Sequence, residues 1–193
     1  MKIIHVTDTH FIPAGQTLYG RDPATALERC IADINRNHPD AERCVITGDL
    51  THWGEPEAFD HLKQHLDQLK VPLRLLVGNH DNRDIFRQRF GDHPCDENGF
   101  IQSVEDLPVG RFIYLDTNKP GHHEGWYCEQ RMQWLEEQFA AAKGKDLYLF
   151  MHHPPFDIGI PALDRISLVQ KGAFSEVVKP HRDQIRHLFF GHI

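Results

Sequence analysis

Residues 73–81 read LRLLVGNHD, an apolar run that ends at Gly78 and is followed by Asn79, His80 and Asp81. This pattern is typical of a buried strand that opens onto a loop. Taken alone, three polar residues after a strand indicate an ordinary turn. The same arrangement recurs along the chain, however, and the recurrence points to a site.

Four other apolar runs end in residues of the same kinds. Residues 2–6 lead to Asp8-Thr9-His10, residues 44–47 to Gly48-Asp49, residues 147–151 to His152-His153-Pro154-Pro155, and residues 188–190 to Gly191-His192. Ligands of open α/β sheets bind at the carboxyl ends of the strands. Five runs that each deliver Asp, Asn or His to that end therefore predict one shared site.

Length and composition indicate a single domain, residues 1–193. With 193 residues and 40% hydrophobic content, the chain can build one substantial core and is short for two. The 21 Lys and Arg residues against 28 Asp and Glu residues give a net charge of −7. This charge disfavours nucleic acid or a membrane surface as a partner.

The sequence also predicts a location in the cell. No apolar run approaches the roughly 20 residues that a membrane span requires. The first motif begins at Asp8, so removal of a signal peptide would remove part of the predicted site. We therefore expect a cytoplasmic protein with no membrane partner. The four cysteines show no zinc-ribbon spacing and are expected to be core or surface thiols.

The spacing of apolar residues predicts alternating strands and helices. Asp22 and Pro23 mark the start of a helix that ends near His38, and an apolar stripe from Phe59 to Leu69 marks a second helix. Further helices are expected over residues 81–90, 128–144 and 173–178, further strands over residues 100–104 and 111–115, and loops over residues 92–99 and 154–161. This alternation favours an α/β fold with a parallel sheet and covering helices.

The predicted site has the composition of a two-metal centre. Two divalent metals about 3.5–4 Å apart need several ligands each and benefit from an anionic bridge, for which Asp49 is the natural candidate. Carboxylates together with imidazoles suit Zn, Mn and Fe better than Ca. Asn79 would add a neutral oxygen ligand, so the centre would stay net positive and attract an anionic phosphate ester.

These motifs, in this order and over the whole chain, resemble the calcineurin-like metallophosphoesterase superfamily. Within it, Thr7-Asp8-Thr9-His10, Leu18-Tyr19-Gly20 and the block of two His and two Pro are most similar to the class III cyclic nucleotide phosphodiesterases, particularly the bacterial glycerophosphodiesterase branch. The resemblance implies a β-sandwich flanked by helices on both faces and built from βαβ units.

The resemblance also implies a role for each site residue. Asp8 and His10 would bind one metal, Asp49 would bridge, and Asn79, His152 and His192 would bind the other. His80 would bind no metal and would act as the catalytic residue, donating to a phosphoryl oxygen or protonating the leaving group. Asn79 and His80 would also contact the substrate. The two metals would be Fe, Mn, Zn or Co.

The last motif departs from the family pattern, which is Gly-His-x-His. The sequence ends at Ile193, one position before the second His, which would complete the shell of the first metal. We therefore expect the single domain to be truncated just inside this motif. Contacts between copies in a homo-oligomer are expected in the part beyond Ile193.

Most of the 15 His residues must lie outside the site. Surface positions are expected for His38, His61, His65, His181 and His187. His5 and His153 are expected in the core or in support of the ligands. Two alternatives stay open at each of the remaining places: His52 and Trp53 line the cleft or pack in a loop, and His122 and His123 touch substrate or lie in an ordinary loop.

The function expected from these features is metal-dependent hydrolysis of small phosphodiesters, either 3′,5′-cyclic nucleotides or glycerophosphodiesters. A hydroxide held between the metals would attack phosphorus in line, and His80 would assist the leaving group. Three alternatives are a phosphomonoesterase or nucleotidase on the same scaffold, a non-catalytic binding subunit, and a nuclease. The net charge of −7 makes the nuclease the weakest of them.

Overall fold

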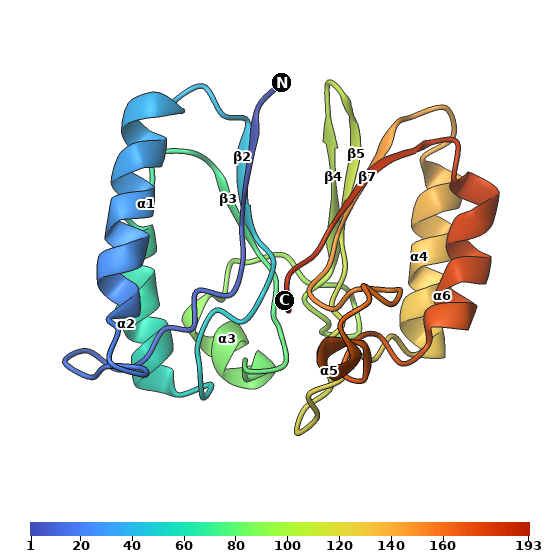
Figure 1. The fold of residues 1–193 in the computed structure, drawn as a ribbon. Coiled ribbons are helices and arrows are strands. Elements are labelled where there is room, and N and C mark those ends of the chain that lie inside the picture. The colour runs from blue at the N-terminus through green and yellow to red at the C-terminus, as the bar shows by residue number, and fades with distance from the viewer.

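The computed structural model describes residues 1–193, which form two β-sheets packed face to face between two layers of helices (Figure 1). The first sheet has three parallel strands in the order β1 (Ile3–Val6), β2 (Arg43–Ile46) and β3 (Leu73–Leu75). The second has the order β4 (Ser103–Leu107), β5 (Gly110–Tyr114), β6 (Leu147–Phe150) and β7 (Ile185–Phe189). In this sheet β4 and β5 are antiparallel, whereas β5, β6 and β7 are parallel.

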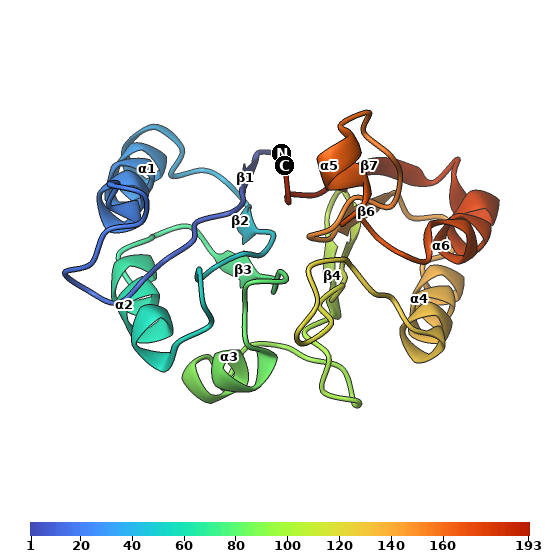
Figure 2. The same ribbon diagram turned by 60° about the horizontal axis from the view of Figure 1, so that its bottom comes forward.

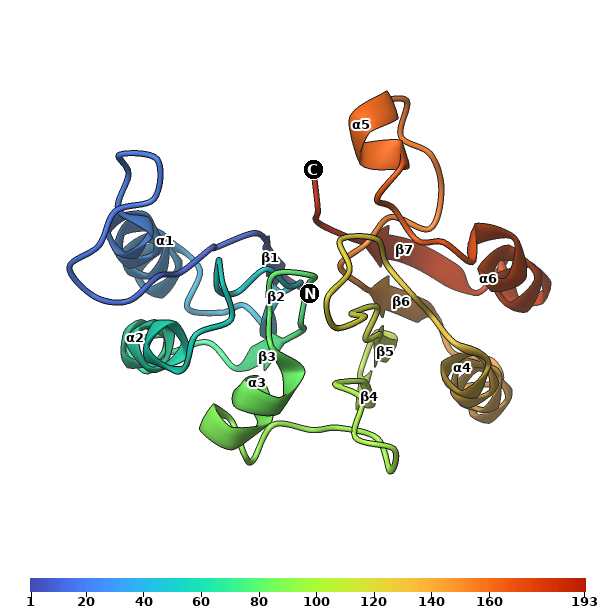
Figure 3. The same ribbon diagram turned by 90° about the horizontal axis from the view of Figure 1, so that it is seen from below.

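The helices lie on the outer faces of the two sheets, as the views from the side and from below show (Figure 1, Figure 3). The first sheet is covered by α1 (Pro23–Asn37), α2 (Pro56–Leu66) and α3 (Arg83–Arg89), and the second by α4 (Glu129–Ala141) and α6 (Lys171–Val178). Two short elements complete the chain, α5 (Pro161–Asp164) and the 3-10 helix η1 (Lys179–His181). The expected α/β sandwich with helices on both faces is confirmed.

Helix α1 shows how local sequence sets an element boundary. The Asp22 carboxylate accepts a hydrogen bond from the Ala24 amide, and Pro23 occupies the first turn, where its missing N–H costs nothing. The buried face carries Leu27, Ile31 and Ile34. These side chains recur at helical spacing and cover the outer face of the first sheet, so the cap fixes the start of the helix and packing fixes its rotation.

Three apolar layers hold the sandwich together. A central layer between the sheets is small and aromatic, and Phe150 of β6 stacks at 5.2 Å on Tyr114 of β5 and at 4.8 Å on Phe189 of β7. Larger clusters lie between each sheet and its own helices. These rings of the second sheet pack with Val45 of β2 and Leu76 after β3, and this contact holds the two sheets together.

Three predicted element boundaries were wrong. The strand expected at residues 100–104 is β4, which starts three residues later and runs to Leu107, because the turn that follows contains just Pro108 and Val109. The last strand, expected from Leu188, starts at Ile185, since polar residues on this edge strand hide the pattern. The loop expected over residues 154–161 ends one residue earlier, because the short helix α5 begins at Pro161.

The parallel strands of both sheets run in the same direction, so their carboxyl ends meet at one edge of the sandwich, the lower edge in Figure 1. Figure 2 turns this edge toward the viewer and shows the connecting loops gathered there. None of the helices has both the length and the apolar character required to cross a bilayer.

Candidate metal centre

The loops that follow the strands keep pairing past the ends of the sheets. The Asp8 amide donates to the Gly48 carbonyl at 3.1 Å, and the His10 amide donates to the Asp49 carbonyl at 2.8 Å. In the second sheet the Gly191 amide donates to the His152 carbonyl at 3.0 Å. These bonds carry the side chains of both sheets to one place between them, as the sequence predicted.

Four residues at this place have left-handed backbone conformations. The φ angles are 55° at Asp8, 44° at His10, 47° at Asp49 and 66° at His192. This region is uncommon for residues with a side chain, and such strained conformations cluster at functional sites. The strain here turns successive side chains inward instead of letting them alternate, so each loop presents its polar groups to the same point.

In one half of the cluster, nitrogen and oxygen atoms with free lone pairs lie around the His152 ring. Its Nδ1 donates to the Thr47 carbonyl at 3.0 Å, which leaves Nε2 as the free nitrogen. This Nε2 lies 3.3 Å from Asp49 Oδ1, 3.3 Å from Asn79 Oδ1 and 3.2 Å from Nδ1 of His192. A proton on one ring satisfies only part of this group, whereas a metal cation contacts all of its lone pairs at once.

The His192 ring, whose Nδ1 faces Nε2 of His152, also fits a cation at this point. His192 is 7% exposed, and its Nε2 has no hydrogen-bond partner. Burial, reinforced by repulsion from His152, lowers the pKa of His192 to about 4. Its ring is therefore neutral at neutral pH, which is the form that binds a metal.

The other half of the cluster lies around His10. Its Nε2 is 3.9 Å from Asp8 Oδ1 and 3.8 Å from Asp49 Oδ2. The second oxygens of both carboxylates are held by the protein, Asp8 Oδ2 by the His192 amide at 3.1 Å and Asp49 Oδ1 by the His80 amide at 3.0 Å. Burial lowers the pKa of His10 despite the attraction of Asp49. Three ligand atoms, one imidazole nitrogen and two carboxylate oxygens, thus lie around one point. This combination fits a borderline divalent metal.

Asp49 lies between the two halves. Burial alone would raise the pKa of its carboxyl, but the attraction of His152 and a hydrogen bond from the His80 amide hold this pKa well below its usual range. The His152 ring shows the reciprocal effect: burial lowers its pKa, and Asp49 raises it by more. The carboxylate is therefore charged, with one oxygen facing each half.

His80 stands beside the cluster with one ring nitrogen fixed. Its Nδ1 donates to the His52 carbonyl at 2.7 Å, so Nε2 is the nitrogen available for chemistry. The ring stacks on His52 with centroids 4.9 Å apart and meets the edge of His10 at the same distance. His52 itself is buried, with Nδ1 3.2 Å from Nδ1 of His10, whereas Trp53 is 67% exposed. His52 therefore supports the neighbouring rings, and Trp53 faces solvent.

The sequence analysis missed a structural role for Asp81. Its buried carboxylate accepts from the amides of Leu50, Thr51 and Gly78 at 2.9–3.0 Å and from the Thr51 hydroxyl at 3.0 Å. Burial and repulsion by Asp49 raise the pKa of Asp81 to about 6, although the backbone hydrogen bonds oppose this rise. The position of Asp81 at the end of the Gly-Asn-His-Asp motif was the sequence feature that could have indicated this role.

A second network joins this loop to the other sheet. Asn118 donates its side-chain amide to the carbonyls of Gly78 and Asp81. Asp116, fully buried, accepts from Arg83 at 2.7 Å, and Arg131 donates to the Asp116 carbonyl at the same distance. No sequence pattern marks these residues, because they are far apart in the chain and meet only when the sheets pack.

Close packing at Gly78 explains the glycine before Asn79. A Cβ at this position would lie 2.2 Å from Asp49 Oδ1 and 2.7 Å from Nε2 of His152. Both distances are shorter than any van der Waals contact. Only glycine lets the loop backbone approach the cluster so closely.

Three further His residues lie near the core, outside the cluster of candidate ligands. His153 is buried, with Nδ1 2.7 Å from the Thr117 hydroxyl, and His5 is half-buried, with Nε2 2.8 Å from the Thr47 hydroxyl. The predicted surface position was wrong for His65, which is 9% exposed and packs its ring 5.4 Å from Phe11, because α2 turns this face toward the core. All four cysteines are free, as expected.

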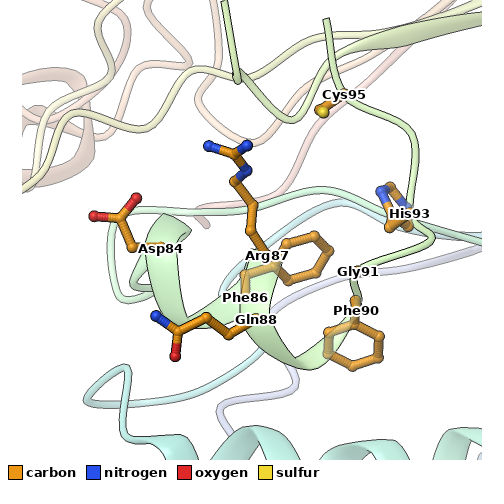
Figure 4. A pocket seen from close by; sticks show the side chains of 8 residues that line it. All are labelled: Asp84, Phe86, Arg87, Gln88, Phe90, Gly91, His93 and Cys95. Atoms are coloured by element: carbon orange, nitrogen blue, oxygen red, sulfur yellow. The ribbon is translucent and has the colours of Figure 1, made fainter.

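A groove lies between α3 and the loop that follows it (Figure 4). It has a volume of about 530 Å³ and is lined by Asp84, Phe86, Arg87, Gln88, Phe90, Gly91, His93 and Cys95. None of the predicted ligands is among them. The groove is therefore separate from the candidate metal centre.

Comparison with known proteins places the chain in a family. The calcineurin-like phosphoesterase family matches residues 1–193. A Rhodopseudomonas palustris protein named "Probable cyclic nucleotide phosphodiesterase" is 42% identical over all of this chain and 71% of its own length. The chain belongs to the calcineurin-like phosphoesterase family.

More distant relatives carry two kinds of name. The glycerophosphodiester phosphodiesterase GpdQ of Enterobacter lignolyticus is 31% identical over all of this chain and 70% of its own length. The 3′,5′-cyclic adenosine monophosphate phosphodiesterase CpdA of Pseudomonas aeruginosa is 27% identical over 99% of this chain and 68% of its own length. A purple acid phosphatase of yellow lupin, at 15% identity and a TM-score of 0.73, covers 99% of this chain and 37% of its own and shares the fold.

Proposed function

We propose that this chain is a metal-dependent hydrolase of small phosphodiesters with a two-metal centre. The observation that carries the proposal is the convergence of Asp49, Asn79, His152 and His192 on one point, with His10 and Asp8 gathered at the other oxygen of Asp49. The names of the relatives support a diester as substrate, since they describe cyclic nucleotide and glycerophosphodiester phosphodiesterases.

The proposed ligand sets follow the two halves of the cluster. Asp8 and His10 would hold one ion, Asn79, His152 and His192 would hold the other, and Asp49 would bridge them through its two oxygens. Fe, Mn, Zn or Co would suit this mixture of imidazole, carboxylate and amide. Such ions activate water and neutralise charge on phosphoryl oxygens when bound.

The protein's own groups would orient the substrate and move a proton. The Nδ1 of His80 is held by the His52 carbonyl and its Nε2 is free, so the doubly protonated ring would donate its Nε2 proton to a phosphoryl oxygen or to the leaving group. The stacked His52 ring fixes the orientation of His80. Asn79 would contribute a side-chain amide beside the same phosphoryl group.

A comparison of two synthetic substrates tests the proposal. The protein is stripped of metal, reloaded with Mn, Fe, Zn or Co in turn, and assayed with bis(p-nitrophenyl) phosphate and p-nitrophenyl phosphate while bound metal is measured by elemental analysis. We expect up to two ions per chain, with the site of Asn79, His152 and His192 filled more completely than that of Asp8 and His10, and a preference for the diester. A monoester preference would instead make the protein a phosphomonoesterase, and loading without turnover of either ester would make it a binding subunit.

Several sequence predictions remain proposals. We propose that a His appended at position 194 would complete the shell of the first ion, which Asp8, His10 and Asp49 would otherwise hold alone. Appending this His and a strand after it should raise occupancy of that ion and diesterase activity together. A cytoplasmic location, contacts between copies and the absence of nucleic-acid or membrane partners also stay predictions.

A further inference from the structure

A small pocket lies directly beside His80. It has a volume of about 300 Å³ and is lined by Trp53, by residues 79–84 and by Pro120 and Gly121. A phosphoryl group at the cluster would therefore have one of its substituents at the mouth of this pocket. The chemistry of the pocket walls decides which substituent that is.

Trp53 gives the pocket a flat aromatic wall. One side of its indole meets the His52 ring, with centroids 4.2 Å apart and planes at 75°, while 67% of the residue is exposed. The following residue, Gly54, packs its backbone against the next loop, since a Cβ there would lie 3.0 Å from the Asn82 amide nitrogen and 3.3 Å from the His80 carbonyl. The indole is thus held in place with much of its surface open.

Two polar residues of the pocket have side-chain donors or acceptors that make no hydrogen bond within the protein. Asn82 uses its side-chain oxygen to accept from the amides of Asp84 and Ile85, and its Nδ2 has no partner in the protein. The exposed Asp84 carboxylate accepts no hydrogen bond. Arg83 makes no hydrogen bond to this carboxylate, because its guanidinium donates to Asp116 at 2.7 Å and to the Asn118 carbonyl.

An indole face with one free donor and one free anionic acceptor beside it suits a planar heterocycle that carries an amino group. Nucleobases stack on aromatic side chains and present donors and acceptors along their edges. A glycerol group has no flat face to cover the indole. The Asp84 charge also disfavours a second anionic group in the pocket.

We propose that this pocket binds the base of a nucleotide diester, with Trp53 stacking on the base and with Asn82 and Asp84 contacting its edge. The proposal rests on the phosphodiesterase function proposed above and narrows its substrate class to diesters that carry a nucleobase. Trp53 acts here as a specificity residue, because it contacts the substituent and not the reacting phosphorus.

The test compares a base-bearing diester with one that lacks a base. The metal-loaded enzyme and its Trp53→Leu and Trp53→Phe variants are assayed with 3′,5′-cyclic AMP and with glycerophosphoethanolamine. Stacking on an aromatic side chain contributes about 5- to 150-fold per base. We expect Trp53→Leu to lower kcat/KM for cyclic AMP by a factor in this range relative to the glycerol diester, and Trp53→Phe to retain most of the preference. Phe156→Ala, which removes an exposed ring outside the pocket, should leave the ratio unchanged.

A binding measurement separates this proposal from the proposed function. Calorimetry of the loaded protein with 5′-AMP and with ribose 5-phosphate isolates the contribution of the base without turnover. Tighter binding of AMP that disappears in Trp53→Leu supports the pocket even if neither diester is hydrolysed, in which case only the proposed function fails. Equal affinities of AMP and ribose 5-phosphate, or an equal loss on both diesters in Trp53→Leu, would overturn the pocket assignment while leaving the hydrolase intact.

Discussion

Replacing Asp81 with Asn should destabilise the protein, although the two side chains have the same shape. The carboxylate takes two hydrogen bonds on each oxygen, from the amide and hydroxyl of Thr51 on Oδ1 and from the amides of Leu50 and Gly78 on Oδ2. Asn has one acceptor oxygen and one NH₂ group. Whichever way the Asn side chain is placed, the NH₂ group faces at least one buried amide N–H.

The magnitude follows from the better of the two placements. With the Asn oxygen toward Leu50 and Gly78, the Thr51 hydroxyl can rotate and accept from NH₂, but the Thr51 amide loses its partner. Stranding a buried donor costs about 1–3 kcal/mol, and the surviving bonds lose the extra strength of a charged acceptor. Relief of repulsion with Asp49 offsets part of this. We therefore expect the free energy of unfolding to fall by about 2–4 kcal/mol.

Urea denaturation measures this change. The assay is run at pH 8, above the pKa of about 6 of Asp81, and with a chelator present so that metal binding does not contribute. The Asp84→Asn variant is the matched control, because it makes the same change in charge at an exposed position three residues away with no hydrogen bond to lose. It should change stability by less than about 0.5 kcal/mol. A fall of under about 1 kcal/mol for Asp81→Asn, with an unchanged denaturant slope, would refute the assigned role of these bonds.

Four further predictions concern other parts of the molecule. His80→Ala should lower kcat by roughly 10²–10⁴ with no change in metal content measured by elemental analysis, since its role is proton transfer and not ligation; loss of metal would make His80 a ligand. Asp49→Ala should lose both ions and all turnover, because each half of the cluster uses one of its oxygens, so a variant that retained two ions would exclude the bridging role. Gly78→Ala should prevent metal loading, measured by the same analysis, because its Cβ would lie 2.2 Å from Asp49 Oδ1. Burial lowers the pKa of His93 to about 4, and its Nε2 accepts a hydrogen bond from the Leu75 amide. Between about pH 6.5 and 4 the unfolded chain binds a proton at this His and the folded protein does not, so the free energy of unfolding should fall by up to about 3 kcal/mol as pH drops through this window. His93→Gln, which keeps an acceptor, should show a shallower fall in urea denaturation.

The sequence by itself identified the ligand candidates because their signal is local. Each of the five motifs consists of an apolar run and the polar residues that directly follow it, and strand ends in parallel sheets are where such residues meet. The same locality explains the successful prediction of α1, whose cap and buried stripe lie within one stretch of chain. Boundaries were less reliable on edge strands such as β7, where two of the five residues, Arg186 and His187, are exposed and polar and hide the apolar pattern.

Only the tertiary structure decided how the candidate ligands are distributed between the two halves of the cluster and which contacts fix their positions. Which oxygen of Asp49 faces His152 and which faces His10 depends on the packing of one sheet on the other. The contacts of Asn118 with the carbonyl of Gly78, and the placement of Trp53 beside the pocket at His80, likewise join segments that are remote in sequence. A linear pattern records the chemistry of a side chain and the period of its element, whereas distance between loops is set by the sheets and helices that carry them.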